Sequence, residues 1–283
     1  MYNNNQVQHH QQSLCCYQNW QAQQQLDLDE LLQVLTQYPT DIGYLQIIIK
    51  KAITHFENYN MVRAHLAKHD GPSFMVPSWG STFENSFLWI GGCRPSLIIR
   101  LVYALCGSQL NAHFDEFLEG VRHGNLGEIS SSQLQNIDDL HAKTVREEDK
   151  LSSRVASQQE KIADEPLVRL ANDYQKRQKV GECSSQGGGR RQVEVVDKVM
   201  DAHALDLYDV LIEADKLRLD ILKDMIDILT PLQAVELLVA AKKLHLSLHE
   251  WSKTRDIRMG VVTQLLNTNI PSSSNGPPSE PCL

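Results

Sequence analysis

Two histidines near the C-terminal end of the sequence have the spacing of a metal-binding pair. His245 and His249 stand in the run Leu-His-Leu-Ser-Leu-His-Glu-Trp, so on a helix both imidazoles lie one turn apart on one face. Apolar side chains of the same helix gather on the adjoining side: Leu237, Leu244, Leu248 and Trp251. We therefore expect the pair at the edge between core and solvent, where it binds a metal or is satisfied by water or a neighbouring carboxylate.

Other chemistry has weaker support in the sequence. Zinc is disfavoured because His-x-x-x-His supplies only two ligands, with no cysteine or acid at metal spacing nearby and without the glutamate of His-Glu-x-x-His. No serine elbow, pair of catalytic acids or Cys-His pair stands out. These observations predict a protein that is not an enzyme.

The elements that position the pair are helical. Thr230, Pro231 and Gln233 form a helix-start signal, and the helix that carries both histidines should extend to about Arg255. Four longer helices are expected before it, from the spacing of apolar residues and caps: 14–38, 42–69, 131–163 and 193–228. No run alternates with the period of a strand.

The most apolar stretch, residues 79–109, should fold as two short helices. Ser81 and Glu84 have the spacing of a capping box, in which each side chain satisfies a free amide of the other residue. The Gly91-Gly92 pair should end the first helix, and Pro95 should begin the second. Because both halves are rich in large side chains and too short to span a bilayer, they should form a buried hairpin wrapped by other helices.

Taken together, the pattern predicts an all-α fold, a single bundle of long and short helices around this buried helical hairpin. Residues 1–12 are almost entirely polar and should form a disordered tail. The helical domain should cover residues 13–258, with a flexible glycine-rich linker at 176–191. Residues 259–283, rich in proline, serine and glycine, should form a second disordered tail.

Charge and hydropathy exclude several classes of function. The 27 basic and 35 acidic residues give a formal net charge of -8, which disfavours autonomous DNA binding because little counterion release is gained on a phosphate backbone. No apolar run has the length of a membrane span, and no leader peptide is recognisable, so we expect a soluble protein without a membrane partner. Six scattered cysteines without a Cys-x-x-Cys motif suit reduced thiols.

Several runs resemble the plant Delay of Germination family of seed-dormancy regulators. The central run Phe-Leu-Trp-Ile-Gly-Gly-Cys-Arg-Pro-Ser and the following Leu-Val-Tyr-Ala-Leu-Cys-Gly-Ser-Gln carry the resemblance. It continues at residues 133–148, 213–218 and 242–251, and so covers most of 15–255. The same domain is shared, more distantly, with the C-terminal half of the TGA class of bZIP transcription factors.

The resemblance implies a non-enzymatic regulator of seed dormancy and germination in abscisic acid signalling. The implied partners are type 2C protein phosphatases, with self-association as a further expectation, and the implied compartment is the nucleus, with the cytoplasm as an addition. The alternative is a transcriptional cofactor that uses the domain as TGA factors do. Since the chain has no bZIP basic region or leucine heptads, such a cofactor would borrow its DNA contact from a partner.

Haem is the cofactor that the resemblance implies, bound through histidines of the motif that His245 and His249 match. Side chains one helical turn apart lie ~6 Å from each other and point the same way, so the pair does not clamp one iron from opposite faces. Either one histidine is the axial ligand and the other supports it, or two chains contribute ligands to one haem. The first arrangement is the preferred expectation, with the ligating histidine unassigned.

Tyr17 and Trp20 match the aromatic pair of a short family segment associated with docking onto type 2C phosphatases. The match is incomplete, because Cys15 and Cys16 replace an acid and a serine, and Asn19 replaces a glutamate. The charge-dependent part of that contact is therefore missing here. The alternative is that both aromatic side chains pack the first helix onto the bundle.

Overall fold

In the computed structural model, the described part of the chain comprises residues 2–106, 126, 129–164, 167–168, 171–172 and 186–261, with side chains described from residue 8 and, in the last long segment, from 196. The main elements within it are helical: α1 (Tyr2–Gln37), α2 (Ile42–Ala67), α3 (Gly71–Met75), α4 (Thr82–Asn85), α5 (Ser96–Cys106), α7 (Ser131–Glu160), the short 3-10 helix η2 (Lys161–Ala163), α9 (Gln186–Ile228) and α10 (Pro231–Arg258). Apart from one isolated bridge between Trp89 and Gly92, these ranges contain no β structure. The expected all-α fold is confirmed.

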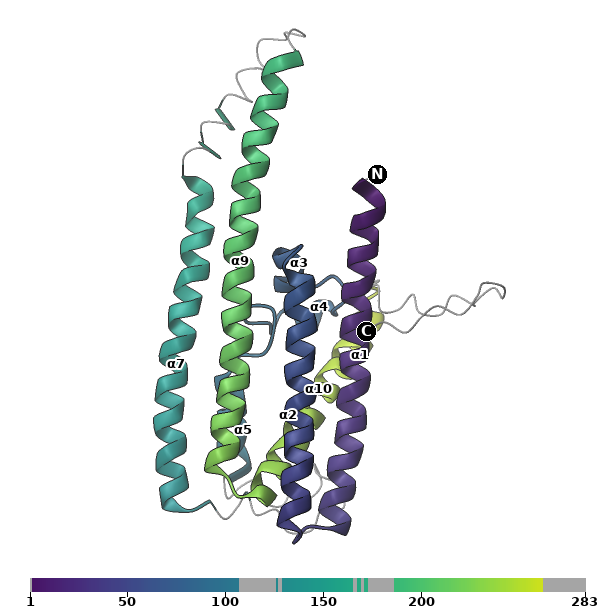
Figure 1. The fold of residues 1–283 in the computed structure, drawn as a ribbon, viewed down its shortest axis with the longest axis vertical. Coiled ribbons are helices and arrows are strands. Elements are labelled where there is room, and N and C mark those ends of the chain that lie inside the picture. Colours follow the sequence, from purple (N-terminus) through teal and green to yellow (C-terminus); the bar gives the residue numbers. More distant parts are fainter. Residues whose placement is uncertain are drawn as a thin grey trace, which may run out of the picture.

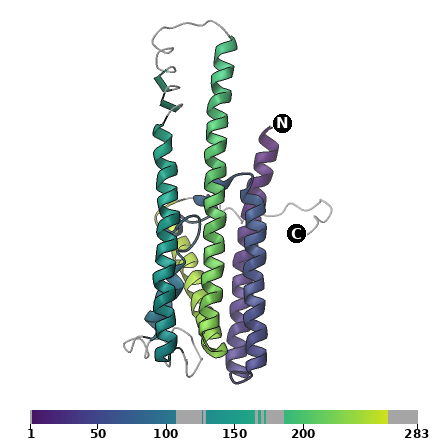
Figure 2. The same cartoon turned by 60° about the vertical axis from the view of Figure 1, so that its left-hand side comes forward.

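Long helices stand side by side in the bundle, and α10 crosses them obliquely (Figure 1). Helix α1 packs on α2 and α10, while α7 packs along α9, so the chain forms two neighbouring pairs (Figure 2). Helix α9 also contacts α2 and α3, and α10 contacts α2, α4 and α5. These contacts bring α4 and α5 against α10, and α3 against α9.

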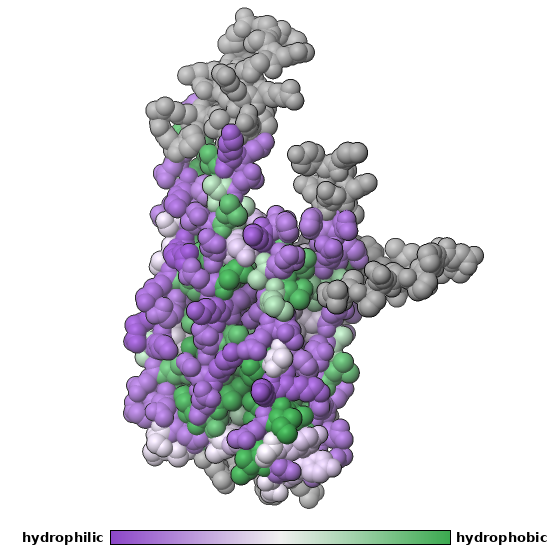
Figure 3. Space-filling view, viewed as in Figure 1, coloured by the Kyte–Doolittle hydropathy of each residue, from purple (hydrophilic) through white to green (hydrophobic). Residues whose placement is uncertain are grey.

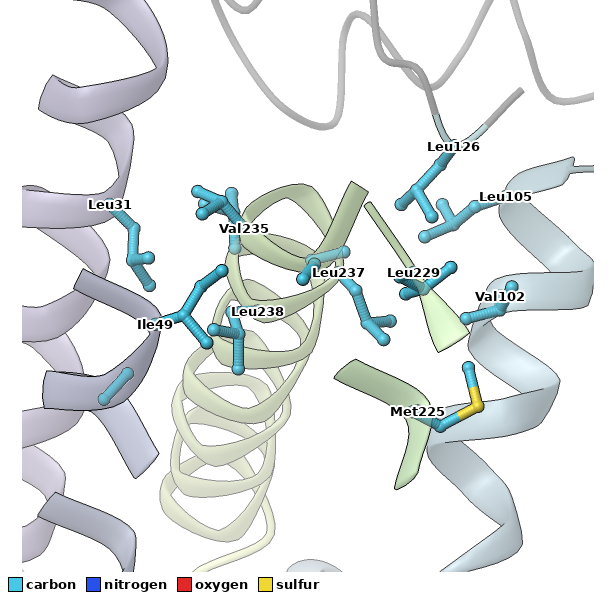
Figure 4. Close-up of a cluster of buried hydrophobic side chains, with 14 of the residues drawn as sticks. Leu31, Ile49, Val102, Leu105, Leu126, Met225, Leu229, Val235, Leu237 and Leu238 are labelled. Atoms are coloured by element: carbon cyan, nitrogen blue, oxygen red, sulfur yellow. The ribbon is translucent and has the colours of Figure 1, made fainter. Parts of the chain in front are cut away.

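The first half of α10 is the most deeply buried part of the described chain. Every residue from 233 to 240 is buried, with exposed fractions of 0–4%. Its side chains meet apolar residues of α1 and α2 on one side and of α5 on the other, as Figure 4 shows for Val235, Leu237 and Leu238. Since a fully buried aliphatic side chain contributes ~1.5–3 kcal/mol, this helix is a major source of the bundle's stability.

A second apolar cluster lies where α3 and the segments around α4 meet the long helices α2, α7 and α9. Its buried members are Ala67, Phe74, Trp79, Ile90, Leu151, Val210, Leu211 and Ala214. They come from α2, α3, α7, α9 and the segments around α4. The cluster fixes the loop that leads into α4.

Three capping boxes begin helices where the sequence predicts them. The hydroxyls of Ser81, Ser130 and Thr230 accept hydrogen bonds from amides three residues later at 3.1, 3.2 and 3.3 Å. In each case the side chain of the N3 residue in turn accepts a hydrogen bond from the backbone amide of the capping residue. Because a capping box satisfies free amides within four residues of chain, it predicts the start of a helix from the local sequence alone.

Three predicted boundaries are wrong. Helix α1 begins at Tyr2, so the supposed disordered tail is helical from that residue; the segment has neither glycine nor proline to interrupt it. Helix α9 begins at Gln186, inside the expected linker. The helix expected to run to residue 69 ends at Ala67, and α3, which the sequence did not predict, follows it with Asp70 as its cap. Residues 173–185 of the linker region and 262–283 of the expected C-terminal tail lie outside the described residues.

The expected hairpin also needs correction. Helix α4 is a single turn, and a turn at residues 89–93 separates it from α5. Ile99 and Val102 of α5 are fully buried, but Phe87 and Leu97 are 57% and 44% exposed. The apolar stretch is therefore buried on one side only. The element that the other helices surround is α10, not the expected hairpin.

Helix α7 is polar on its outer side, in line with the thin apolar stripe of its sequence (Figure 3). Two polar residues that interrupt the stripe are nevertheless fully buried, Thr144 and Glu148. The Glu148 carboxylate accepts hydrogen bonds from the amide of Ser96 at 2.6 Å and from Arg94 at 2.6 Å. It thus satisfies a free amide at the start of α5, which places a negative charge at the positive end of that helix.

A buried group of three charged side chains, the arginine clamp, holds the turn at 89–93. Arg63 of α2 and Arg218 of α9 both donate to the Oδ1 atom of Asp215, at 2.5 and 2.6 Å. Their other nitrogens donate to carbonyl oxygens of the turn: Trp89, Ile90, Gly91 and Cys93. The guanidinium groups thus satisfy carbonyl oxygens that are not paired in a helix at this turn.

The same turn contains left-handed backbone. Ile90 and Gly91 have φ values of 46° and 65°, and a β-branched residue in this region costs ~1–2 kcal/mol. A Cβ atom at Gly91 would lie 2.3 Å from the carbonyl oxygen of Phe74. The position therefore requires glycine both for its dihedral angle and for its space.

Candidate functional site

The His249 cluster joins three helices and comprises His249 of α10, Glu84 of α4 and Tyr17 of α1. The Nδ1 atom of His249 lies 3.2 Å from the Tyr17 hydroxyl and 3.3 and 3.2 Å from the two Glu84 carboxylate oxygens. The Tyr17 hydroxyl also donates to Glu84 at 3.0 Å. The His249 and Glu84 side chains are only 16% and 12% exposed, so the three groups interact in a largely water-free setting.

Helix starts position the cluster. Glu84 is the N3 residue of the α4 capping box, so its carboxylate is fixed by the same bonds that begin the helix. At the far end of α10, the Oδ2 atom of fully buried Asp256 accepts a hydrogen bond from the Thr82 amide at 2.6 Å. Helix α10 therefore holds α4 at two points, through His249 and through Asp256.

The cluster shifts the proton equilibria of its members. Burial alone would raise the pKa of Glu84, but the hydrogen bonds from His249 and Tyr17 outweigh it and hold that pKa below its ordinary value. Burial and the adjacent carboxylate raise the pKa of Tyr17 far above its usual range. With Glu84 ionised and Tyr17 protonated, Nδ1 of His249 is placed to donate a hydrogen bond to the carboxylate.

His245 lies one turn earlier on α10 and is in a drier position. Its Nε2 atom is excluded from solvent and has no hydrogen-bond partner. Burial, helped by His249 and Lys242 and opposed by Glu84, lowers the pKa of His245 from 6.5 to about 4. The ring is therefore neutral at physiological pH, and its Nε2 nitrogen takes part in no hydrogen bond inside the bundle.

The two histidines thus differ more than their spacing predicts. His249 is a boundary histidine whose ring is satisfied by a carboxylate, one of the two expectations for the pair. The Nε2 atom of His245 is shut off from solvent and has no hydrogen-bond partner. Leu237 is fully buried as expected, but Trp251 is 62% exposed. The apolar stripe expected along this helix therefore does not continue as packed surface to the end of α10.

The two aromatic residues of the expected docking segment make internal contacts. The ring of Trp20 stacks on Tyr59, with centroids 4.3 Å apart and planes 11° apart, and lies 5.6 Å from Phe56. The ammonium of Lys242 stands 5.9 Å from the centre of the Trp20 ring. With Tyr17 in the His249 cluster, the packing alternative describes what both side chains do in this structure, and their role in docking stays a prediction.

The surroundings of the two histidines bear on the expected metal or haem binding. Across the described ranges, no three histidine, cysteine, aspartate or glutamate side chains are placed together to hold a metal ion. A haem iron needs a single imidazole on one face. His249 has the Nδ1-to-carboxylate bond that usually supports a ligating imidazole, and His245 has the unpaired Nε2. Haem binding by either histidine remains a prediction.

Sequence reasoning missed the residues that hold the site from a distance. The sequence pattern singled out neither Asp256 nor Glu148, both of which are fully buried, and it did not predict the arginine clamp. Asp215 and Arg218 do lie in the Glu-Ala-Asp-Lys-Leu-Arg run that carries part of the family resemblance. That run was the available signal, since an acid and an arginine three residues apart share one helix face.

Fold and site together define an all-α helical-bundle protein with a buried histidine, carboxylate and phenol cluster. A family model described as "DOG1: Seed dormancy control" matches residues 27–104. Protein DOG1-like 3 of Arabidopsis thaliana is 34% identical over 249 residues, which cover 85% of this chain and 84% of that protein. Protein DOG1-like 1 of the same plant is 35% identical, over 86% and 89% of the two chains. The chain belongs to the DOG1 family.

Similarity extends to a class of transcription factors. Transcription factor TGA5 of Arabidopsis thaliana is 25% identical over 83% of this chain and 62% of its own length. None of the three relatives' names is that of an enzyme. Within the described residues, no helix has an apolar stretch that would cross a bilayer.

Proposed function

We propose that this protein is a non-enzymatic regulator of seed dormancy and germination in abscisic acid signalling, acting through protein–protein contacts. The observation that carries the proposal is near-full-length similarity to DOG1-like proteins, which extends over 84–92% of the first three relatives. The test is genetic: loss of the gene should shorten dormancy and lower abscisic acid sensitivity of seeds. Unchanged germination timing in a null line would contradict it.

The proposed partner is a type 2C protein phosphatase that docks at the N-terminal segment around residues 15–25. Tyr17 and Trp20 anchor this stretch of α1 from within, while Asn19 and Ala22 are exposed beside them. Because Asn19 and Ala22 are three residues apart, they share one face of the helix. In this arrangement the aromatic pair sets the position of α1, and the exposed face meets the partner.

A pull-down with purified phosphatase separates the two contributions. Asn19→Arg with Ala22→Arg changes only exposed positions and should weaken binding if this face is the contact, with Gln135→Arg at an exposed position of α7 as a control for added charge. Tyr17→Ala with Trp20→Ala should weaken binding too, and its circular dichroism reports any loss of helix. Phosphatase binding that is unaltered in both double variants would remove the proposed docking site.

We further propose haem as a ligand, with His249 or His245 as the single axial ligand. The support is the carboxylate on Nδ1 of His249 and the neutral, unpaired imidazole of His245. Bound iron would supply a centre that changes oxidation state and binds diatomic gases. A haemin titration should give a Soret band that His245→Ala with His249→Ala abolishes, and the single variants assign the ligand. A band that survives the double substitution would place the ligand elsewhere.

A second candidate is a transcriptional cofactor in the nucleus, favoured by the similarity to TGA5 and TGA2. Such a protein would join DNA-bound complexes through its helical domain, because the net charge of -8 gives it little affinity of its own for a phosphate backbone. A salt-titrated gel shift of the protein alone should show no sequence-specific complex. A nuclear signal from a fluorescent fusion is expected for both candidates, whereas specific binding by the isolated protein would refute the charge argument.

A further inference from the structure

Three exposed histidines from two segments lie close together near the C-terminal end of α2. Helix α1 passes this end of α2 (Figure 1). His9 belongs to α1, His65 to the last turn of α2, and His69 to the turn that follows. The ring centroids of His9 and His69 are 4.8 Å apart, with an interplanar angle of 29°. Those of His65 and His69 are 6.1 Å apart, at 85°. None of these residues belongs to the His249 cluster.

The backbone keeps His65 and His69 one helical turn apart. The amides of Lys68 and His69 still bond back to the carbonyls of Ala64 and Leu66, each at 3.2 Å, so the helical path continues past the end of α2. Two histidines at this spacing on one helix face are a recurrent chelating pair. His9 reaches the same place from a different helix, which supplies a third imidazole.

The ring separations suit a shared ion. Metal–nitrogen bonds of ~2.0–2.1 Å place an imidazole centroid ~3.2 Å from the metal, so two ligating rings at ordinary bond angles have centroids ~4.5–6 Å apart. In their present rotamers the described side chains do not converge on one metal position. All three histidines are exposed, however, and rotation about their side-chain bonds moves the ring nitrogens without disturbing the core.

We propose that His9, His65 and His69 form a site for a divalent transition metal of the imidazole-preferring group, such as Zn²⁺, Ni²⁺ or Cu²⁺. Three imidazoles suit these ions, and water completes the coordination. The formal net charge of -8 also favours a cation over an anion at an exposed site.

The metal would fasten the polar beginning of α1 to α2. In that region the ring of His10 lies 5.9 Å from that of Trp79, and the Ser13 hydroxyl donates to the His9 carbonyl within α1. An ion bound by one imidazole of α1 and two from α2 and its following turn joins these segments only in the folded state. Its binding therefore stabilises that state in proportion to the logarithm of metal concentration.

Isothermal titration of tag-free protein with ZnCl₂ and, separately, NiCl₂ tests the site. We expect one ion per chain, with affinity reduced at least ~10-fold by His65→Ala or His69→Ala. The triple variant, which also carries His9→Ala, should not bind. His203→Ala, at a partly exposed position of α9, is the matched control and should bind as the parent does.

Two further measurements separate this site from the proposed haem ligands. His245→Ala with His249→Ala should leave zinc binding unchanged, and zinc should slow amide exchange at the start of α1 in the parent but not in the triple variant. Because the three substituted residues are exposed, the variants should keep the parent's circular dichroism. Absence of binding by the parent, or equal binding by the triple variant, would overturn the proposal.

Discussion

His245 links the structure to a measurable dependence of stability on pH. Burial, reinforced by His249 and Lys242 against the pull of Glu84, lowers its pKa from 6.5 to about 4. The unfolded chain therefore binds a proton that the folded protein refuses between these two values. The stability contributed by this group is fully present above the unfolded pKa and is lost as the pH falls toward 4.

The expected size follows from that pKa difference. Between about pH 7.5 and about pH 5 the group should remove at most ~2 kcal/mol from the free energy of unfolding. Stopping near pH 5 keeps Glu84 ionised, because its pKa lies below the ordinary value. Urea unfolding followed by circular dichroism at both pH values gives the free energies directly.

The perturbation is His245→Leu. The Nε2 atom has no hydrogen-bond partner, so replacing the ring by an apolar side chain should change stability near neutral pH by less than ~1 kcal/mol. The variant should then lose ~2 kcal/mol less than the parent on acidification. His203→Leu on α9 controls for loss of a histidine and should lose as much as the parent. Equal losses for the parent and the His245→Leu variant would refute the reasoning.

Three further substitutions test the turn and its supports by the same unfolding assay. Gly91→Ala should cost more than ~2 kcal/mol because its φ is 65° and the new carbon meets a carbonyl, whereas Gly43→Ala, which meets only a side-chain oxygen at 3.5 Å, should be neutral or stabilising. Glu148→Gln should cost ~1–3 kcal/mol and Glu147→Gln, at a partly exposed position of α7, less than ~0.5 kcal/mol; equal costs would contradict the α5 contact. Asp215→Asn should cost ~3–5 kcal/mol, because two buried guanidinium groups lose their counterion; a cost below ~1 kcal/mol would argue against the clamp.

The sequence predicted features whose physics is local. The capping boxes at Ser81, Ser130 and Thr230 begin helices where expected, because both partners of each bond lie within one turn. The all-α class followed from apolar spacing for the same reason. Helix ends were predicted less well, since α1 extends into polar sequence without glycine or proline and α9 extends across the glycine run at 187–189.

The candidate site depended on contacts that sequence spacing does not encode. His245 and His249 were found from their spacing, but which of them meets a carboxylate depends on Glu84, 165 residues away from His249. Asp256 bonds an amide 174 residues away, and Glu148 one 52 residues away. A polar residue within an apolar stripe reads as solvent-facing unless its distant partner is known, so these buried acids were missed.

The turn at 89–93 lies within the family-matched segment, residues 27–104, yet half of its support comes from elsewhere in the chain. Asp215 and Arg218 of the clamp lie far beyond that segment, as does Glu148 of α7, which accepts the hydrogen bond from the first amide of α5. A fragment limited to the matched residues would leave Arg63 as an uncompensated cation and several carbonyls unpaired. The segment by which the family is recognised is therefore not an autonomous folding unit, and dissecting the protein into smaller pieces should abolish the turn.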